Sequence, residues 1–380
     1  MSPCYSYHGV IEMKLKVTIF CIFIMVQFLN ALDMKLSKRI TFSEDKTIIG
    51  GIYSFAVTED GYFLLLDIVM NDIKIYSPEG KLEKVWGRKG PGPNEFLSPF
   101  ICNYNDFNKN FYVMDFGKNR LIVLKREGKA DFKQITEIIK IREAMKISSI
   151  DKDRLLIDGY HLGKESKSYE LYIYNTVSGE KTFLLPSEIK YGMYSMNEYK
   201  SNMYKGKKVN YIGILGFSDF YGDNAYYVWE GDLRIIKINL KTKMINSFGY
   251  KTSNYKQPVC TSEMEKSKKE MNHKAYLSEK ARMSCLCDVL ANKNYVIVIY
   301  NKPRKDLNDQ NSGFFFQFYK PDGTFIKEIG IKEDCIDMRF YLKKNSNELF
   351  CFMATPKIES NSDEEEYGDI HTMLKFKVTE

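Results

Sequence analysis

Four carboxylates stand at equivalent places along the chain, each at the end of a short apolar, strand-like segment. They are Asp67, Asp115, Asp158 and Glu230. Carboxylate oxygens that converge on one point can bind a cation or a basic ligand. A carboxylate that ends a strand also accepts hydrogen bonds from the backbone amides of the loop that follows. We favour this second, structural role for each of the four and keep the first as a hypothesis about function.

The segments that position these carboxylates belong to a strand-rich unit that recurs about every 50 residues, a spacing typical of ring-shaped or solenoid arrays. In its first copy, four strand-like runs cover residues 53–57, 62–66, 73–76 and 82–86. Polar turns that contain glycine separate the first from the second run and the third from the fourth, and the third run alternates apolar and polar residues as a strand does. Four such strands form one blade of a β-propeller.

Six copies of the unit predict an all-β protein, a six-bladed β-propeller whose blades are four-stranded antiparallel sheets. The last copy lacks an outer strand, and an open sheet edge promotes aggregation. The N-terminal run at residues 39–42 is free to supply that strand, so we expect it to close the ring. Insertions are expected near 187–213 and 259–284, the second with helical composition over 263–282 and an N-cap at Ser262.

The first 32 residues have the layout of a secretory leader, with Met13 as an alternative start of translation. Two lysines precede an apolar run over residues 17–26, and a small residue follows at a distance suited to cleavage. The run is short for a membrane span, so an uncleaved anchor, which would be the one contact with a membrane, is the less favoured alternative. We expect an exported protein of the bacterial periplasm or cell envelope, with a single domain over residues 33–380.

The composition excludes several classes of protein. The 380 residues are 44% hydrophobic and 14% aromatic, enough for packed sheets, and the net charge of +7 comes from interspersed Lys and Arg. Without a basic block, no nucleic-acid partner is expected, and we expect a monomer. The 4 histidines have no metal-motif spacing, no serine lies in a nucleophile elbow, and packing is favoured over metal binding for Cys285 and Cys287. No catalytic residue, metal or cofactor is predicted.

The most specific motif is the segment GRKGPGPNEFLSP at residues 87–99, which joins the outer strand of one blade to the inner strand of the next. Its glycines permit unusual backbone angles and its prolines stiffen the crossing, so its predicted role is structural, with Arg88 and Lys89 kept as ligand-binding candidates. The segment resembles the linker of NHL-type six-bladed propellers, and residues 113–123 resemble the second and third strands of that repeat. After the leader, the order of elements is similar to that of TolB-like propellers, common as exported proteins in Bacteroidetes. This resemblance implies the fold and an exported location, and no particular activity.

In a four-stranded meander, the loop between the second and third strands and the link to the next blade leave the sheet on the same side. Ring closure would gather these loops around one mouth of the central channel, here called the loop face, which we predict to bind the ligand. The candidate residues are Asp67, Arg88, Lys89, Asp115, Asn119, Arg120, Asp158, Tyr160, His161, Trp229 and Glu230.

Two functional hypotheses follow from this face. The first is a non-catalytic binding or scaffolding protein whose ligand is a protein, a peptide or a glycan. The alternative is a metal-assisted hydrolase or lactonase with a cation at the channel mouth.

Overall fold

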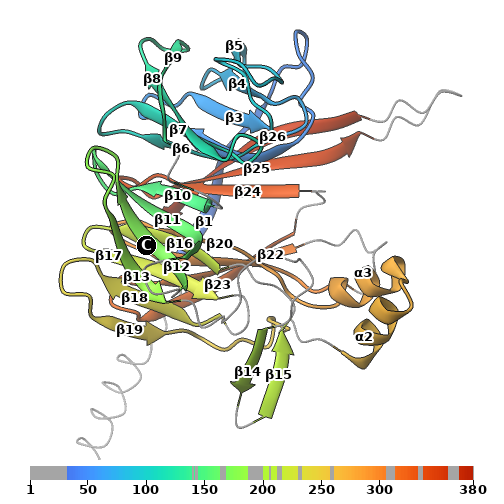
Figure 1. Cartoon of the computed structure of the whole chain (residues 1–380). Helices are drawn as coiled ribbons and strands as arrows, with labels where there is room; N and C mark the ends of the chain where they lie inside the picture. Colours follow the sequence, from blue (N-terminus) through green and yellow to red (C-terminus); the bar gives the residue numbers. More distant parts are fainter. Residues whose placement is uncertain are drawn as a thin grey trace, which may run out of the picture.

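Six four-stranded antiparallel sheets, arranged as the blades of a ring, make up the protein (Figure 1). The computed structural model describes residues 32–138, 141, 144–162, 168–186, 200–204, 207–211, 216–229, 233–256, 261–304, 313–332, 337–357 and 368–379. Within each blade the strand order follows the sequence, with the N-terminal strand added to the last blade. The predicted all-β, six-bladed propeller is confirmed.

The first three blades run in chain order without interruption. Blade 1 contains β2 (Ile52–Val57), β3 (Phe63–Asp67), β4 (Asp72–Tyr76) and β5 (Leu82–Trp86). Blade 2 contains β6 (Pro99–Asn105), β7 (Asn110–Asp115), β8 (Arg120–Arg126) and β9 (Phe132–Ile138). Blade 3 contains β10 (Ala144–Ser149), β11 (Arg154–Leu162), β12 (Ser168–Asn175) and β13 (Lys181–Pro186).

The other three blades complete the ring. Blade 4 contains β16 (Gly216–Tyr221), β17 (Asn224–Trp229), β18 (Ile235–Asn239) and β19 (Ile245–Phe248). Blade 5 contains β20 (Leu286–Ala291), β21 (Val296–Asn301), β22 (Gly313–Tyr319) and β23 (Phe325–Lys332). Blade 6 contains β24 (Asp337–Leu342), β25 (Glu348–Lys357), β26 (Gly368–Thr379) and β1 (Asp33–Thr41).

The apolar core is divided among the interfaces between blades. In β3, Leu64 packs in a cluster shared with blade 2, whereas Leu65 packs in a cluster shared with blade 6. Successive side chains of a strand point to opposite faces of its sheet, so each blade has two apolar faces and needs a neighbour on both sides. The middle strands β3 and β4 are therefore fully buried, and the outer strand β5 is largely exposed.

The N-terminal strand closes the ring. β1 pairs antiparallel with β26, with Asp33 opposite Thr379 and Thr41 opposite Thr372, and one bulge between Leu36 and Lys38. The ring of Phe42, just after β1, lies 5.6 Å from that of Phe63 in blade 1 and 6.0 Å from that of Phe352 in blade 6. The predicted closure is confirmed, and the strand that supplies it is longer than the run at residues 39–42.

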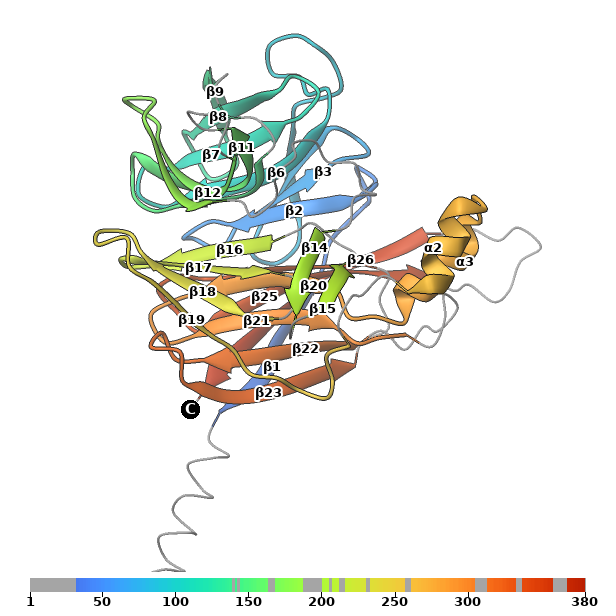
Figure 2. The ribbon, with the colours of Figure 1, turned by 60° about the horizontal axis from the view of Figure 1, so that its bottom comes forward.

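Two segments lie outside the blades (Figure 2). A two-stranded sheet, β14 (Lys200–Tyr204) and β15 (Lys207–Tyr211), stands between blades 3 and 4 in the sequence. Two helices, α2 (Ser262–Lys269) and α3 (His273–Ala281), stand between blades 4 and 5 and lie at one side of the ring in Figures 1 and 2. The helical segment predicted over 263–282 is thus two helices. The hydroxyl that accepts a hydrogen bond at the start of α2 is that of Thr261, from the Met264 amide at 3.2 Å, and Ser262 is already the first helical residue.

Ring closure by β1 predicts that Ile40→Ala is strongly destabilising. The Ile40 side chain is 5% exposed in the cluster between blades 1 and 6, and truncation of a buried Ile costs about 2–5 kcal/mol of unfolding free energy. Leu36, on the same strand but 47% exposed, provides the matched control, because Leu36→Ala should cost less than about 0.5 kcal/mol. Urea unfolding of both variants measures the difference. Equal losses of unfolding free energy in Ile40→Ala and Leu36→Ala would show that β1 does not contribute to the core.

Candidate functional site

Asp67, the first of the predicted carboxylates, holds the segment that leads into blade 1 by hydrogen bonds. Its side chain is fully buried and accepts hydrogen bonds from the backbone amides of Gly50 (2.7 Å), Gly51 (3.2 Å), Val69 (3.0 Å) and Met70 (3.0 Å). The ammonium group of Lys74, also buried, lies 2.8 Å from Asp67 Oδ2 and 2.7 Å from Asp72 Oδ1. The carboxylate therefore joins the segment before β2 to the loop after β3.

Asp115 repeats this arrangement in blade 2. It accepts hydrogen bonds from the amides of Leu97 (2.9 Å) and Ser98 (2.9 Å), just before β6, and from the Lys118 amide (3.2 Å) in the loop after β7. Like Asp67, it is fully buried. Both side chains thus have the loop-fastening contacts that the structural alternative predicts.

Asp158 differs from the other two. It stands opposite Lys146 in the pairing of β10 with β11, and its Oδ2 has no hydrogen-bond partner among the described residues. Burial raises the pKa of Asp158 well above its ordinary value, against the opposing effect of Lys146. We infer that this carboxyl group is neutral over a pH range in which an exposed aspartate is charged.

The four remaining residues of the second-strand ends are only partly described. Tyr160 and His161 belong to β11 and Trp229 to β17, but their side chains lie outside the described part of the structure. Glu230 lies outside the described residues altogether.

The linker at residues 87–99 is held by its own contacts. Arg88 Nε lies 2.8 Å from Glu95 Oε1, the Gly92 amide donates to Glu95 at 2.8 Å, and Phe96 is buried against Trp86 at 5.5 Å between ring centroids. At Gly90, a Cβ atom would lie 2.2 Å from a Glu95 oxygen, so glycine is required there. The linker has the structural role predicted for it.

The other candidates near this linker are on the surface of blades 1 and 2. Lys89 is exposed. Asn119 has a positive φ of 54° in the loop between β7 and β8, and Arg120 forms an ion pair with Glu137 of β9. None of these three lines the central channel.

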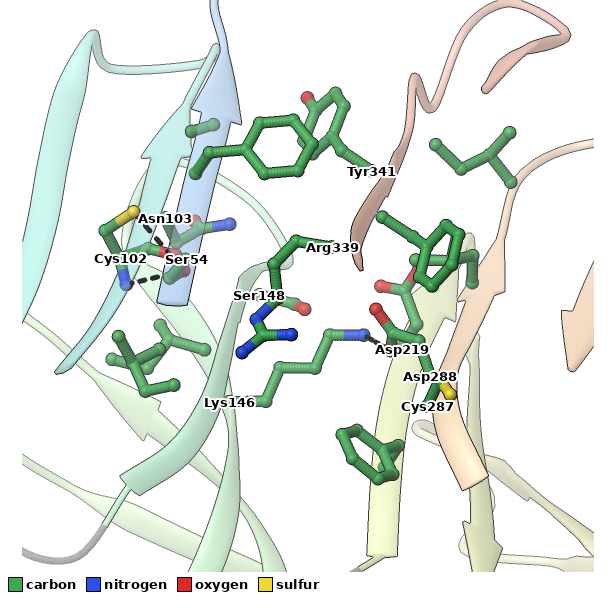
Figure 3. A pocket seen from close by; sticks show the side chains of 18 of the residues that line it. Ser54, Cys102, Asn103, Lys146, Ser148, Asp219, Cys287, Asp288, Arg339 and Tyr341 are labelled. Atoms are coloured by element: carbon green, nitrogen blue, oxygen red, sulfur yellow. Dashed lines mark hydrogen bonds and ion pairs between the residues drawn. The ribbon is translucent and has the colours of Figure 1, made fainter. Parts of the chain in front are cut away.

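The structure instead has a cavity of about 850 Å³ in the central channel, lined by residues of all six inner strands. That volume lies within the usual range for a small-molecule site. None of the predicted residues whose side chains the structure describes lines it. The lining combines aromatic rings with hydroxyl, amide and charged groups, among them Ser54, Asn103, Ser148, Arg339 and Tyr341 (Figure 3).

Two ion pairs cross the channel between blades that are not neighbours. Lys146 of β10 pairs with Asp288 of β20, past blade 4, and donates to the Val289 carbonyl at 2.9 Å. Lys344, just after β24, pairs with Asp219 of β16, past blade 5. Burial acts to raise the pKa of Asp288 and to lower that of Lys344, and the latter pKa falls despite the Asp219 charge. Each pair is therefore largely shielded from water.

Arg339 continues this polar lining on the side of blades 1 and 2. Its Nε donates to the Tyr53 carbonyl at 2.8 Å and its Nη1 to the Met338 carbonyl at 2.8 Å, and its guanidinium carbon lies 4.6 Å from the Tyr53 ring centroid. In Figure 3 the side chains of Arg339 and Lys146 both reach into the middle of the cavity. The guanidinium and the tyrosine ring form one composite surface.

The sequence contained a signal for these residues that the prediction missed. Lys146, Asp219 and Asp288 are each the single charged residue of a short first strand of a blade, and Arg339 shares its first strand with one other charged residue, Asp337. The first strand is the innermost one, so a charge in its middle faces the channel or must be buried. The predicted carboxylates lie at the ends of second strands, so the prediction did not include these residues of the first strands.

Two further observations bear on the class of the site. Among the described residues, no three His, Cys, Asp or Glu side chains are grouped so that they could hold a metal ion. Within that same part of the chain, no helix is long and apolar enough to cross a membrane.

The contacts of Asp67 predict that Asp67→Asn destabilises the fold by about 2–3 kcal/mol, because it removes one of the two carboxylates that pair with the buried Lys74 ammonium group. Asp115→Asn provides the comparison, since Asp115 binds amides and no lysine, and the loss there should be about 1–2 kcal/mol. Urea unfolding measures both, and any ligand binding should persist wherever the variants are folded. A variant of normal stability that no longer binds would show that Asp67 acts on the ligand.

The raised pKa of Asp158 predicts the pH dependence of stability. Below about pH 4 the carboxyl group is protonated in the folded and the unfolded chain. As the pH rises towards the folded-state pKa, the unfolded chain ionises first, so stability is lost. Asp158→Asn removes that loss, and its stability relative to the unmodified protein should increase from pH 4 to pH 8 in urea unfolding. Parallel pH profiles for Asp158→Asn and the unmodified protein would contradict the assignment.

Comparison with known proteins supports the fold. No family model and no curated protein matches the chain. A solved member of the DUF4221 family from Bacteroides vulgatus is similar with a TM-score of 0.63 and 12% identity, over 92% of this chain and 99% of that one. A protein from Bacteroides fragilis that its name gives as exported is similar with a TM-score of 0.56 and 12% identity, over 91% and 96% of the two chains. At these identities the likeness shows that this chain shares the six-bladed fold of Bacteroides proteins.

Proposed function

We propose that this chain is an exported, non-catalytic propeller that binds a ligand in its central channel. The observation that carries the proposal is the cavity of about 850 Å³ to which all six inner strands contribute polar and aromatic side chains. Concave sites of this size, apolar in part and with a few converging polar groups, are the usual binding sites for small molecules and short chains. A peptide end or a short glycan fits this description.

The export of the protein is part of the proposal. The layout of the first 32 residues is that of a secretory leader, and one of the similar structures is named as exported. Membership of the TolB-like or NHL-like propellers would agree with the leader and with the exported similar structure. The linker at residues 87–99 and the order of the strands support that membership.

A binding role accounts for the described carboxylates better than metal-assisted hydrolysis does. The alternative requires carboxylates that converge on a cation at the channel mouth. Asp67 and Asp115 instead accept hydrogen bonds from the amides of their own loops. The two carboxylates that pair across the channel each bind a lysine instead, in Lys146–Asp288 and Lys344–Asp219.

A thermal-shift screen with neutral and acidic disaccharides and tripeptides tests this proposal. Asn103 lines the cavity and is half-buried, so Asn103→Trp places a large ring in the channel. We expect this variant to abolish the ligand-induced increase in Tm. Asn246→Trp, on the exposed outer strand of blade 4, should retain the full increase.

Two outcomes would count against the proposal. An increase in Tm that is equal in both tryptophan variants would place the ligand outside the channel. Chromatographic conversion of a stabilising probe into a product would favour the enzymatic alternative.

A further inference from the structure

The two ends of the channel differ in charge. Near the loop face, Lys302 and Arg304 follow β21 and line the cavity, and among the described residues neither side chain has a hydrogen bond or an ion pair. At the opposite end, Asp106 follows β6 in the turn towards β7. Because the crossing pairs Lys146–Asp288 and Lys344–Asp219 cancel, Lys302 and Arg304 leave an excess of positive charge among the described lining residues at the end of the cavity near the loop face.

A row of stacked aromatic rings leads from this end of the channel to the loop face. The Tyr53 ring lies 3.9 Å from that of Phe100, at 26°, and the Phe100 ring lies 5.0 Å from that of Phe116, at 28°, between centroids. All three rings are partly exposed, and the Arg339 guanidinium lies over Tyr53 at the channel end of the row. The stacked faces cover one another, so the row presents ring edges next to a cationic group.

Hydroxyl and amide groups complete the lining on the same side. Ser54 of β2, Asn103 of β6 and Ser148 of β10 belong to three consecutive blades and face the cavity that Arg339 enters. A ring with several hydroxyl substituents meets hydrogen-bonding partners there, and its apolar face meets the aromatic side chains that line the cavity, among them Tyr53 and Tyr341. An acidic substituent on that ring would lie within the field of Lys302 and Arg304.

We propose that the ligand is a sugar that carries an anionic group, and that Lys302 and Arg304 select it. This inference rests on the proposed channel-binding function and adds the chemical class of the ligand. Carboxylate and phosphate share the chemistry that these two cations recognise, so both kinds of acidic sugar belong to the proposal.

Calorimetric titration with matched probes tests the charge requirement. Digalacturonate is compared with its dimethyl ester, which keeps both rings and removes the charges, and glucose 1-phosphate is compared with glucose. We expect each acid to bind at least about tenfold more tightly than its neutral counterpart, and the advantage to shrink as salt is added. The acid that binds more tightly shows whether the anionic group is a carboxylate or a phosphate.

The double variant Lys302→Gln/Arg304→Gln should remove that advantage and leave the affinity for the neutral probe unchanged. The matched control, Lys129→Gln/Lys133→Gln, changes the net charge equally at two exposed positions of blade 2. It should alter the binding of the acids by less than about twofold.

The outcomes separate this inference from the proposal on which it rests. Neutral probes that bind as tightly as the acids, and are lost in Asn103→Trp, would overturn the charge selection and leave channel binding intact. Equal effects of the two double variants would overturn it as well. Absence of any binding that depends on the channel would overturn both.

Discussion

Closure of the ring is the constraint on which the structure depends. A blade is a sheet with two apolar faces, as the alternate burial of Leu64 and Leu65 in two different clusters shows. A chain of six such sheets left open would expose one face at each end of the row, at a cost that grows with the apolar area. β1 pairs with β26, and Phe42 packs between blades 1 and 6, so these two apolar faces are buried against each other. The two ends of the described chain are therefore joined in one sheet.

A closed ring also fixes the distances across its centre. The inner strands cannot move apart independently, so Lys146 and Lys344 can each reach a carboxylate two blades away. Buried ion pairs of this kind rarely stabilise a fold more than apolar packing would, because both charges lose their hydration. An apolar channel would thus serve stability as well as this one does. The charged lining agrees with the proposed binding role.

The sequence was sufficient for the fold because strand spacing, turn residues and the missing outer strand are local features that repeat. It also indicated the loop-fastening role of Asp67 and Asp115, since a carboxylate at a strand end accepts nearby amides in many settings. Charges inside first strands indicated side chains that face the channel, but not which of them pair across it. Lys146 and Asp288 are 142 residues apart, and they lie close together because the ring is curved. A local sequence pattern does not contain this long-range information. The stacking of Tyr53 on Phe100, which in turn stacks on Phe116, likewise joins two blades.

The loop-fastening carboxylates and the channel are linked by rigidity. Asp67 holds the segment that leads into β2, the strand that carries Tyr53 and Ser54, and Asp115 holds the segment that leads into β6, which carries Phe100 and Asn103. These two inner strands supply two of the three rings of the aromatic row and part of the hydroxyl and amide lining. A mouth whose strands are already fixed loses little conformational entropy when a ligand enters. The carboxylates that first suggested a ligand site would then act on the ligand indirectly, because they hold the surface that it contacts.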